Sequence, residues 1–172
     1  MVTQTDLELA DGRTLHAYDT GTDNAAGRLA VFWHHGSLNV GAPPEPLFPA
    51  AEELGIRWVS YDRPGYGGST PHPDRDVATA ASYASAVADA LGIDRFAVMG
   101  YSHGGSHALG CAALLPERVL GVVNVAGTAP FGAEATRATS SSTSCTTSSS
   151  NRAPGWVRSG STSRPRTPWP VR

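Results

Sequence analysis

Hydrophobic and polar positions along the first 130 residues of the chain follow two kinds of spacing, which predict alternating strands and helices. Residues 5–21 alternate apolar and polar side chains around the turn dipeptide Asp11-Gly12, a pattern typical of a β-hairpin. Three strands buried on both faces are predicted, the first from a continuous apolar run, and a fourth strand is expected after them. These stretches are residues 29–33, 56–61, 96–100 and 119–130.

Helices are predicted between these strands. The clearest one carries its apolar side chains on one face, begins near Asp76 and ends before Gly92. That face comprises Val77, Ala80, Ala81, Ala84, Val87, Ala88 and Leu91. Residues 46–54 form a shorter predicted helix, and residues 102–115 form one that ends before Pro116. The alternation predicts an α/β fold: a mostly parallel sheet with flanking helices and an antiparallel hairpin at one edge.

The pattern stops near Ala135. Residues 135–172 contain 17 Ser or Thr and show no apolar repeat. Such a segment cannot bury enough apolar surface to offset the entropy of the chain, so we expect it to be disordered. The predicted organisation is a partial α/β domain over residues 1–134 and a low-complexity tail over residues 135–172.

Charge divides the chain at the same place. The formal net charge is −2, but all 15 acidic residues lie at or before Glu134, where seven arginines leave a net charge of −8. The other six arginines follow Ala135 without any acid. Two explanations of the tail stay open: a frameshift in a GC-rich gene, or a natural basic tail that touches acidic surfaces. The acidic body carries no basic or aromatic patch, which argues against a nucleic-acid partner.

The sequence also predicts where in the cell the protein is found and whether it uses disulfides, metals or a membrane. Cys111 and Cys145 are too few and too differently placed to predict a disulfide framework or a zinc site. The opening residues are polar and do not resemble a secretory signal, and no apolar run reaches the roughly 18 residues of a membrane helix. We therefore expect a cytoplasmic protein that uses no membrane partner, and no sign of a cofactor or metal is present.

Candidate chemistry begins with the stretch Gly100 to Gly105, which reads GYSHGG between a predicted strand and a predicted helix. This is the G-x-S-x-G pattern of a nucleophile elbow, in which a serine sits on a sharp, strained turn. Ser102 is the candidate nucleophile, because Gly100 and Gly104 leave room for the turn and Gly105 lets the helix pack on the sheet. The backbone N–H of His103, at the start of the helix, is expected to point toward an oxyanion on the substrate.

Two further motifs follow the earlier strands. The stretch HHGS, residues 34–37, ends the first apolar run, and the N–H of Ser37 is expected to be a second oxyanion donor. The stretch YDRPGYGGS, residues 61–69, ends the second run. A substrate pocket is expected beside the nucleophile. Its predicted lining is His35, Gly36, Ser37, Tyr101 and His103.

In this order and at these spacings, the three motifs resemble those of the α/β-hydrolase fold family, over roughly residues 5 to 133. The likeness is to serine hydrolases such as esterases, proline iminopeptidase-like enzymes and non-haem haloperoxidases. It implies the N-terminal part of an α/β-hydrolase fold, Ser102 as nucleophile, and Ser37 and His103 as oxyanion-hole donors. Asp62 and Arg63 would brace the loop beside the site. A serine at the elbow argues against the dehalogenase and epoxide-hydrolase branches, which use aspartate there.

The resemblance also implies two partners for the serine, in the chain order serine, acid, histidine. After Ser102 the sequence has no histidine beyond His107 and no acids except Glu117 and Glu134. We therefore expect a serine hydrolase of a small ester, amide or related acyl substrate whose triad acid and histidine are missing from this chain. The alternative is an inactive, truncated remnant or a binding module that keeps the elbow and the oxyanion hole.

The other histidines leave two minor alternatives. His34 or His35 could replace the missing base, although fixing the loop is the expected role of both. His103 and His107 have the spacing of a zinc pair on a helix, but the HExxH glutamate is absent, so no metal site is predicted. The sequence does not determine the oligomeric state.

Overall fold

A six-stranded sheet carries the fold in the computed structural model, which describes residues 1–21 and 27–128. The spatial order of the strands is β1-β2-β4-β3-β5-β6. Their bounds are β1 Thr3–Glu8, β2 Thr14–Asp19, β3 Leu29–His34, β4 Ile56–Tyr61, β5 Phe96–Tyr101 and β6 Val119–Val125. The predicted domain boundary at residue 134 and the predicted disorder of residues 135–172 lie outside the described residues.

The predicted hairpin is confirmed at one edge of the sheet. Strands β1 and β2 are antiparallel, with Thr3 opposite Asp19 and Glu8 opposite Thr14. Gly12 closes the turn at a φ of 79°, a conformation that glycine adopts without steric cost. Strand β2 is also antiparallel to β4, whereas β4, β3, β5 and β6 run parallel to one another. The predicted fold class, a mostly parallel sheet with flanking helices, is therefore confirmed.

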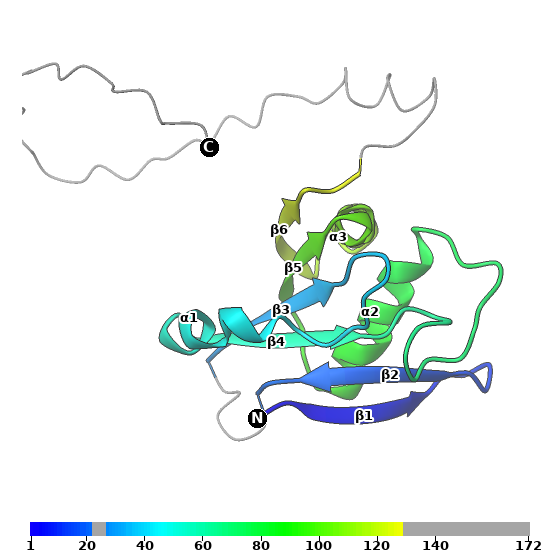
Figure 1. Cartoon of the computed structure of the whole chain (residues 1–172), viewed down its shortest axis with the longest axis horizontal. Coiled ribbons are helices and arrows are strands. Elements are labelled where there is room, and N and C mark those ends of the chain that lie inside the picture. The colour runs from blue at the N-terminus through cyan, green and yellow to red at the C-terminus, as the bar shows by residue number, and fades with distance from the viewer. Residues whose placement is uncertain (22–26, 129–172) are drawn as a thin grey trace, which may run out of the picture.

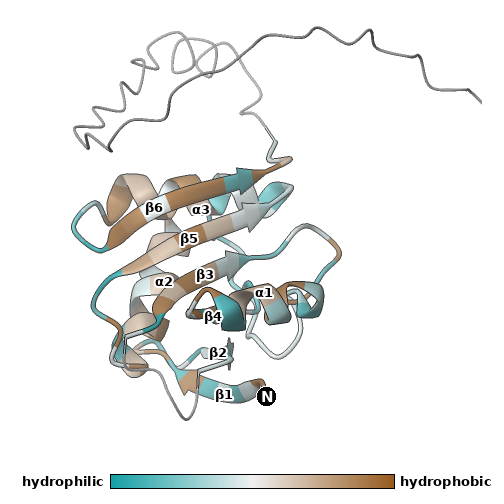
Figure 2. Cartoon of the chain, turned by 90° about the vertical axis from the view of Figure 1, so that its left-hand side faces the viewer, coloured by the Kyte–Doolittle hydropathy of each residue, from teal (hydrophilic) through white to brown (hydrophobic). Residues whose placement is uncertain are grey.

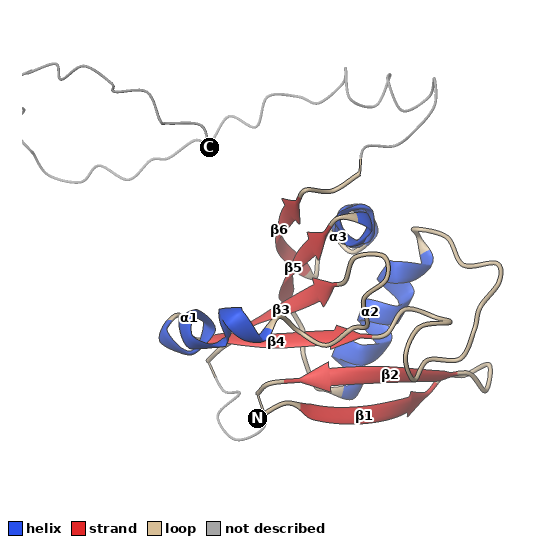
Figure 3. Cartoon of the chain, in the orientation of Figure 1, coloured by secondary structure: helices blue, strands red, loops and turns tan. Residues whose placement is uncertain are grey.

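The helices cover the two faces of the sheet unequally (Figures 1 and 3). Helices α2 (Thr79–Ala90) and α3 (His103–Leu114) lie on one face, and the shorter α1 (Phe48–Glu53), preceded by a 3₁₀ turn (Glu45–Leu47), lies on the other. The predicted helix over 46–54 thus divides into a 3₁₀ turn and an α-helix. Among the described residues, no helix has both the length and the apolar character that crossing a membrane requires.

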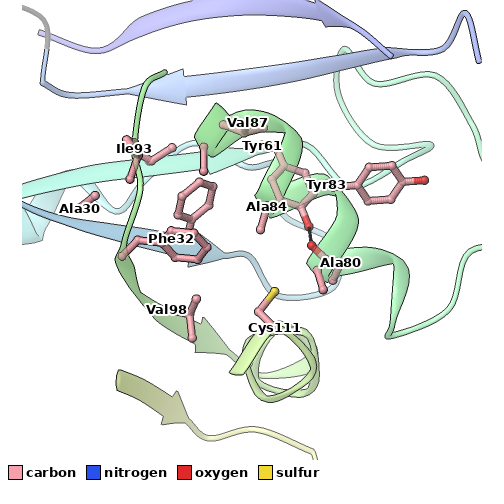
Figure 4. Close-up of a cluster of buried hydrophobic side chains, with 14 of the residues drawn as sticks. Ala30, Phe32, Tyr61, Ala80, Tyr83, Ala84, Val87, Ile93, Val98 and Cys111 are labelled. Carbon is pink, nitrogen blue, oxygen red and sulfur yellow. Dashed lines mark hydrogen bonds between the residues drawn. The ribbon is translucent and has the colours of Figure 1, made fainter. Parts of the chain in front are cut away.

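The main core lies between the sheet and the face that α2 and α3 cover (Figure 4). Phe32 and Phe96 from adjacent strands pack with ring centroids 4.6 Å apart, and both are fully buried. Alanines dominate the buried face of α2, which lets this helix approach the sheet closely. A smaller cluster of Val31, Ala51 and Trp58 fills the face under α1.

Helix α2 begins two residues later than its apolar spacing suggests. The N–H of Thr79 donates to the Asp76 carboxylate at 2.8 Å, which satisfies one of the free donors at the helix start. Val77 precedes the helix and is 41% exposed, so its prediction as part of the buried face is wrong. Ala84 and Val87, at the centre of that face, are fully buried as predicted.

Strand β6 is the other edge of the described sheet. It pairs with β5, and no strand of the described residues pairs with its far side. Its apolar side chains are exposed, with Leu120 at 48% and Val123 at 53%, and Figure 2 shows their hydrophobic colour along the strand. The composition of this strand is that of a buried strand, whereas its surroundings are those of an open edge.

Candidate active site

Ser102 lies on the turn that joins β5 to α3. Its backbone has φ 53° and ψ −123°, a region that side-chain-bearing residues rarely adopt. The Ser102 N–H donates to the carbonyl oxygen of Val125 at 2.9 Å, and the Ser102 carbonyl accepts the N–H of Gly105 at 3.0 Å. These two bonds hold the strained turn between the end of β6 and the first turn of the helix.

Two glycines make this turn possible. A Cβ atom at Gly100 would overlap the carbonyl oxygen of Gly104, and a Cβ atom at Gly104 would overlap the carbonyl oxygen of His34. Both obstructions are backbone atoms of packed elements, so they cannot swing away as a flexible side chain could. The sequence pattern around Ser102 is therefore a steric requirement of the turn.

The loop after β3 lies directly against Ser102. A Cβ atom built on Gly36 would lie 3.5 Å from the Cβ of Ser102. His103 is the first residue of α3, where backbone N–H groups have no acceptor within the helix. Within the described part of the chain, the N–H groups of Ser37 and His103 are bonded to no acceptor. Both N–H groups are therefore without a protein acceptor in this part of the chain, and the predicted oxyanion hole stays a prediction.

Asp62 holds the loops around the site together. Its buried carboxylate accepts the N–H of Gly41 at 2.5 Å, the N–H of Gly68 at 2.8 Å and the hydroxyl of Tyr18 at 3.2 Å. Its own carbonyl accepts the hydroxyl of Ser69 at 2.7 Å. The bracing that the sequence analysis expected of Asp62 is thus present.

His35 fixes the loop after β3, and both of its ring nitrogens are occupied. Nδ1 donates to the carbonyl oxygen of Gly36 at 2.8 Å, and Nε2 accepts the N–H of Arg63 at 3.2 Å. Burial, followed by the charge of Arg63, lowers the pKa of His35 to about 4. At neutral pH this histidine is an uncharged structural bridge between two loops.

His34 points into the core instead. Its Nε2 lies 3.6 Å from the sulfur of Cys111, and burial together with the neighbouring His107 and Arg63 lowers its pKa to about 3. Among the described residues, no histidine is hydrogen-bonded to the Ser102 hydroxyl. The alternative of His34 or His35 as the missing base therefore gains no geometric support.

A cavity of about 430 Å³ opens beside the oxyanion donors. We call it the Arg63 cavity. Its lining is Ser37, Arg63, Tyr66, Pro73, Arg75, Asp76, Val77, His103 and His107. Two of the predicted lining residues, Ser37 and His103, are among them. His35 is buried behind the loop, Gly36 faces the elbow, and Tyr101 is exposed outside the cavity.

Comparison with known proteins places these features in a family. Residues 30–144 match the family model described as alpha/beta hydrolase fold, which is more than half of the chain. The chain belongs to this family. The chain is also similar in structure to several solved crystal structures of this fold.

Three of these structures show the extent of the likeness. A probable hydrolytic enzyme from Pseudomonas aeruginosa is 26% identical, with a TM-score of 0.63 over 75% of this chain and 42% of that one. An alpha/beta hydrolase fold protein from Nakamurella multipartita is 28% identical, with a TM-score of 0.60 over 77% of this chain and 46% of that one. A predicted CIB-like hydrolase from Thermoplasma acidophilum is 23% identical, with a TM-score of 0.59 over 74% and 64%, and shows the fold alone. The chain thus spans between two fifths and two thirds of the length of these three proteins.

Seven of the nine residues that line the cavity were not predicted as site residues by the sequence analysis, among them Arg63, Tyr66, Arg75 and His107. One signal could have found Arg63, because it follows a parallel strand and ligands bind at the carboxyl ends of such strands. His107 lies one helical turn after His103, on the same side of α3. The described residues contain no group of three or more His, Cys, Asp or Glu side chains that could hold a metal ion.

Proposed function

We propose that this α/β hydrolase is a serine hydrolase of a small ester, amide or related acyl substrate, with Ser102 as its nucleophile. The observation that carries the proposal is the strained turn at Ser102. The unbonded N–H of His103 directly follows it, and the loop of Gly36 and Ser37, in which the N–H of Ser37 is also unbonded, lies against it. A turn of this kind stores strain at functional sites, and paired backbone donors stabilise negative charge on oxygen.

The reaction follows from these positions. The Ser102 oxygen attacks the carbonyl carbon of the substrate, and the carbonyl oxygen takes the negative charge and accepts the two N–H groups. Collapse of this intermediate breaks the bond to the alcohol or amine and leaves an ester on Ser102, which water then hydrolyses. The serine proton needs a basic acceptor, and residues 1–21 and 27–128 bring none to the hydroxyl.

That last observation favours a second candidate, in which the chain keeps the elbow and the oxyanion donors as a binding module without turnover. A serine without a base stays protonated at neutral pH and reacts slowly. Loss of triad members lowers turnover by about 10⁶-fold in related chemistry, and oxyanion binding leaves a residual of about 10³-fold over water.

Labelling with a fluorophosphonate separates the two candidates. The full chain is treated with the reagent, and the modified residue is identified by mass spectrometry of its peptides. The serine-hydrolase proposal expects rapid modification of Ser102 that S102A abolishes, while S106A, which changes the serine within α3, leaves it unchanged. Modification no faster than that of free serine in the folded chain would contradict turnover and support the binding module.

A further inference from the structure

Arg63 is a buried cation without a carboxylate partner. Its side chain is 4% exposed, and no Asp or Glu oxygen of the described residues lies within 4.0 Å of its guanidinium nitrogens. Four of the other arginines form ion pairs. These are Arg13 with Asp11, Arg28 with Glu52, Arg57 with Asp19, and Arg118 with Asp89. A guanidinium is expensive to bury without an opposite charge, so this exception calls for a counterion.

The contacts that Arg63 does make hold its position without neutralising its charge. Nη2 donates to the carbonyl oxygen of Gly36 at 3.0 Å, and Nη1 lies 3.1 Å from Nδ1 of His107, while Nε has no partner. Burial lowers the pKa of His107 to about 4, with the charge of Arg63 as the next cause, so this imidazole is a neutral acceptor at pH 7. Each terminal nitrogen of Arg63 keeps one N–H that these contacts leave free.

A second guanidinium faces the same cavity. The Cζ atoms of Arg63 and Arg75 lie 5.0 Å and 5.8 Å from the ring centroid of Tyr66, and both residues line the Arg63 cavity. The one acid in the lining, Asp76, accepts the N–H of Thr79 and forms no ion pair with either arginine. The cavity is therefore positively charged. One of its two cationic side chains, Arg63, is buried and held in position, and the other, Arg75, is exposed.

The position of this space connects it to the reaction. Ser37 and His103, the two proposed oxyanion donors, line the cavity, and His103 directly follows Ser102, which is not itself a lining residue. A group held beside Arg63 can therefore belong to a molecule whose carbonyl lies at Ser102. The planar fork of a guanidinium matches the two oxygens of a carboxylate, and a cavity of about 430 Å³ has room for a small molecule.

We propose that the Arg63 cavity binds the free carboxylate of an acidic substrate, such as a half-ester or half-amide of a short dicarboxylic acid, with Arg63 as its buried counter-charge and Arg75 as the second. The scissile bond in this assignment rests on the proposed function, whereas the carboxylate site itself does not. Hydrolysis at Ser102 would then release a dicarboxylic acid, or a carboxylate-bearing alcohol or amine.

Calorimetric titration of the full chain at pH 7, in a low-salt buffer free of phosphate, tests the site without any turnover. The probes are succinate and succinamide, which have nearly the same size and differ in charge. We expect succinate to bind in the millimolar range or tighter, and succinamide to bind at least about tenfold more weakly. Added sodium chloride should weaken succinate and leave succinamide unchanged.

Three variants locate the binding. R63Q should lower succinate affinity at least about tenfold, and the exposed R75Q, which removes no core contact, should lower it about three- to tenfold. The matched control is R28Q, because Arg28 pairs with Glu52 beside α1, away from this cavity, and its loss should leave succinate binding unchanged. Equal affinity for succinate and succinamide, no binding of either, or full binding by both R63Q and R75Q would each overturn the proposal. Stronger binding of inorganic phosphate than of succinate would overturn the choice of a carboxylate.

Fluorophosphonate labelling keeps this proposal separate from the proposed function. Succinate should protect Ser102 from the reagent in the wild-type chain and protect it less in R75Q. Labelling of Ser102 without any succinate binding would overturn the carboxylate site alone. Succinate binding without labelling of Ser102 would overturn the nucleophile and leave the carboxylate site in place.

Discussion

Lowering the pH from 7 to 5 is expected to destabilise the protein through three buried histidines. His34 has a pKa of about 3, and His35 and His107 have pKa values of about 4, in each case because burial disfavours the charged imidazole. The ordinary value of a histidine is about 6.5. The unfolded chain therefore binds protons at these positions before the folded chain does. The stability that this difference contributes is complete above pH 6.5 and is lost as the pH falls toward 4.

The size of the effect follows from proton linkage. A histidine that titrates at about 6.5 when unfolded and at about 4 when folded loses about 2 kcal/mol of stabilisation between pH 7 and pH 5. Three such groups set a ceiling of about 6 kcal/mol, which is comparable with the 5–15 kcal/mol that holds a typical domain together. Arg63 contributes to the lowered pKa of each of the three histidines, so their three contributions are not independent. The observed loss should therefore lie below this ceiling.

Urea unfolding, followed by tryptophan fluorescence, to which the buried Trp58 contributes, measures this loss at pH 7, 6 and 5. The wild-type free energy of unfolding should fall by several kcal/mol, and H107Q should make the fall smaller by about 2 kcal/mol. H103Q is the comparison, because His103 is exposed one turn away on the same helix. It should reduce the fall much less than H107Q does, since its charge is only a lesser cause of the lowered pKa of His107. The carboxyl groups of Asp11 and Glu52 have lowered pKa values, so their loss of charge falls below this window. A wild-type free energy that stays constant from pH 7 to pH 5, or an H107Q chain with the wild-type slope, would refute the reasoning.

Three substitutions test the geometry of the site in the same unfolding assay. S102G should raise the free energy of unfolding by about 1–3 kcal/mol, because glycine removes the strain of the positive φ, whereas S102A should not. G104A should lower it by about 1–3 kcal/mol or more through overlap with a carbonyl oxygen of β3. G121A, where a Cβ atom meets nothing within 4 Å, is the matched control and should change it little. D62N should lower it by about 1.5–3 kcal/mol, since an amide cannot accept two opposed N–H groups, and D74N on the exposed loop should be neutral.

The fold was predictable because most of its signals are local. Strand β4 spans residues 56–61, the same bounds as the predicted strand. It lies between two neighbouring strands, and such an interior strand is buried on both faces. The hairpin follows from alternation and from one turn glycine. The start of α2 was less accurate: Val77 fits the apolar period but precedes the helix, which begins at Thr79. An apolar period describes a face and does not fix the residue at which a helix begins.

The exposure of β6 was not predictable from its own residues. The stretch VLGVVNV has the composition of an interior strand, and what packs against it is a property of other parts of the chain. In the site, the pattern of a nucleophile elbow around Ser102 could be recognised in the sequence, because its glycines lie within six residues. The contact between Arg63 and His107 joins positions 44 residues apart and depends on the strand order β4-β3-β5, which no local pattern specifies.

The open edge at β6 and the serine without a base are two aspects of one arrangement. The N–H of Ser102 is bonded to Val125 at the end of β6, so the serine lies where that strand terminates. On its other side, the loop at Gly36 lies against the elbow, and Arg63 and His107 line the Arg63 cavity. The β6 side is therefore a second open approach to Ser102, beside that of the cavity. Because parallel strands all end at the same edge of a sheet, a strand added beside β6 would cover its apolar side chains and direct the loop that follows toward Ser102. A strand at that position would therefore change both the edge of the sheet and the surroundings of Ser102.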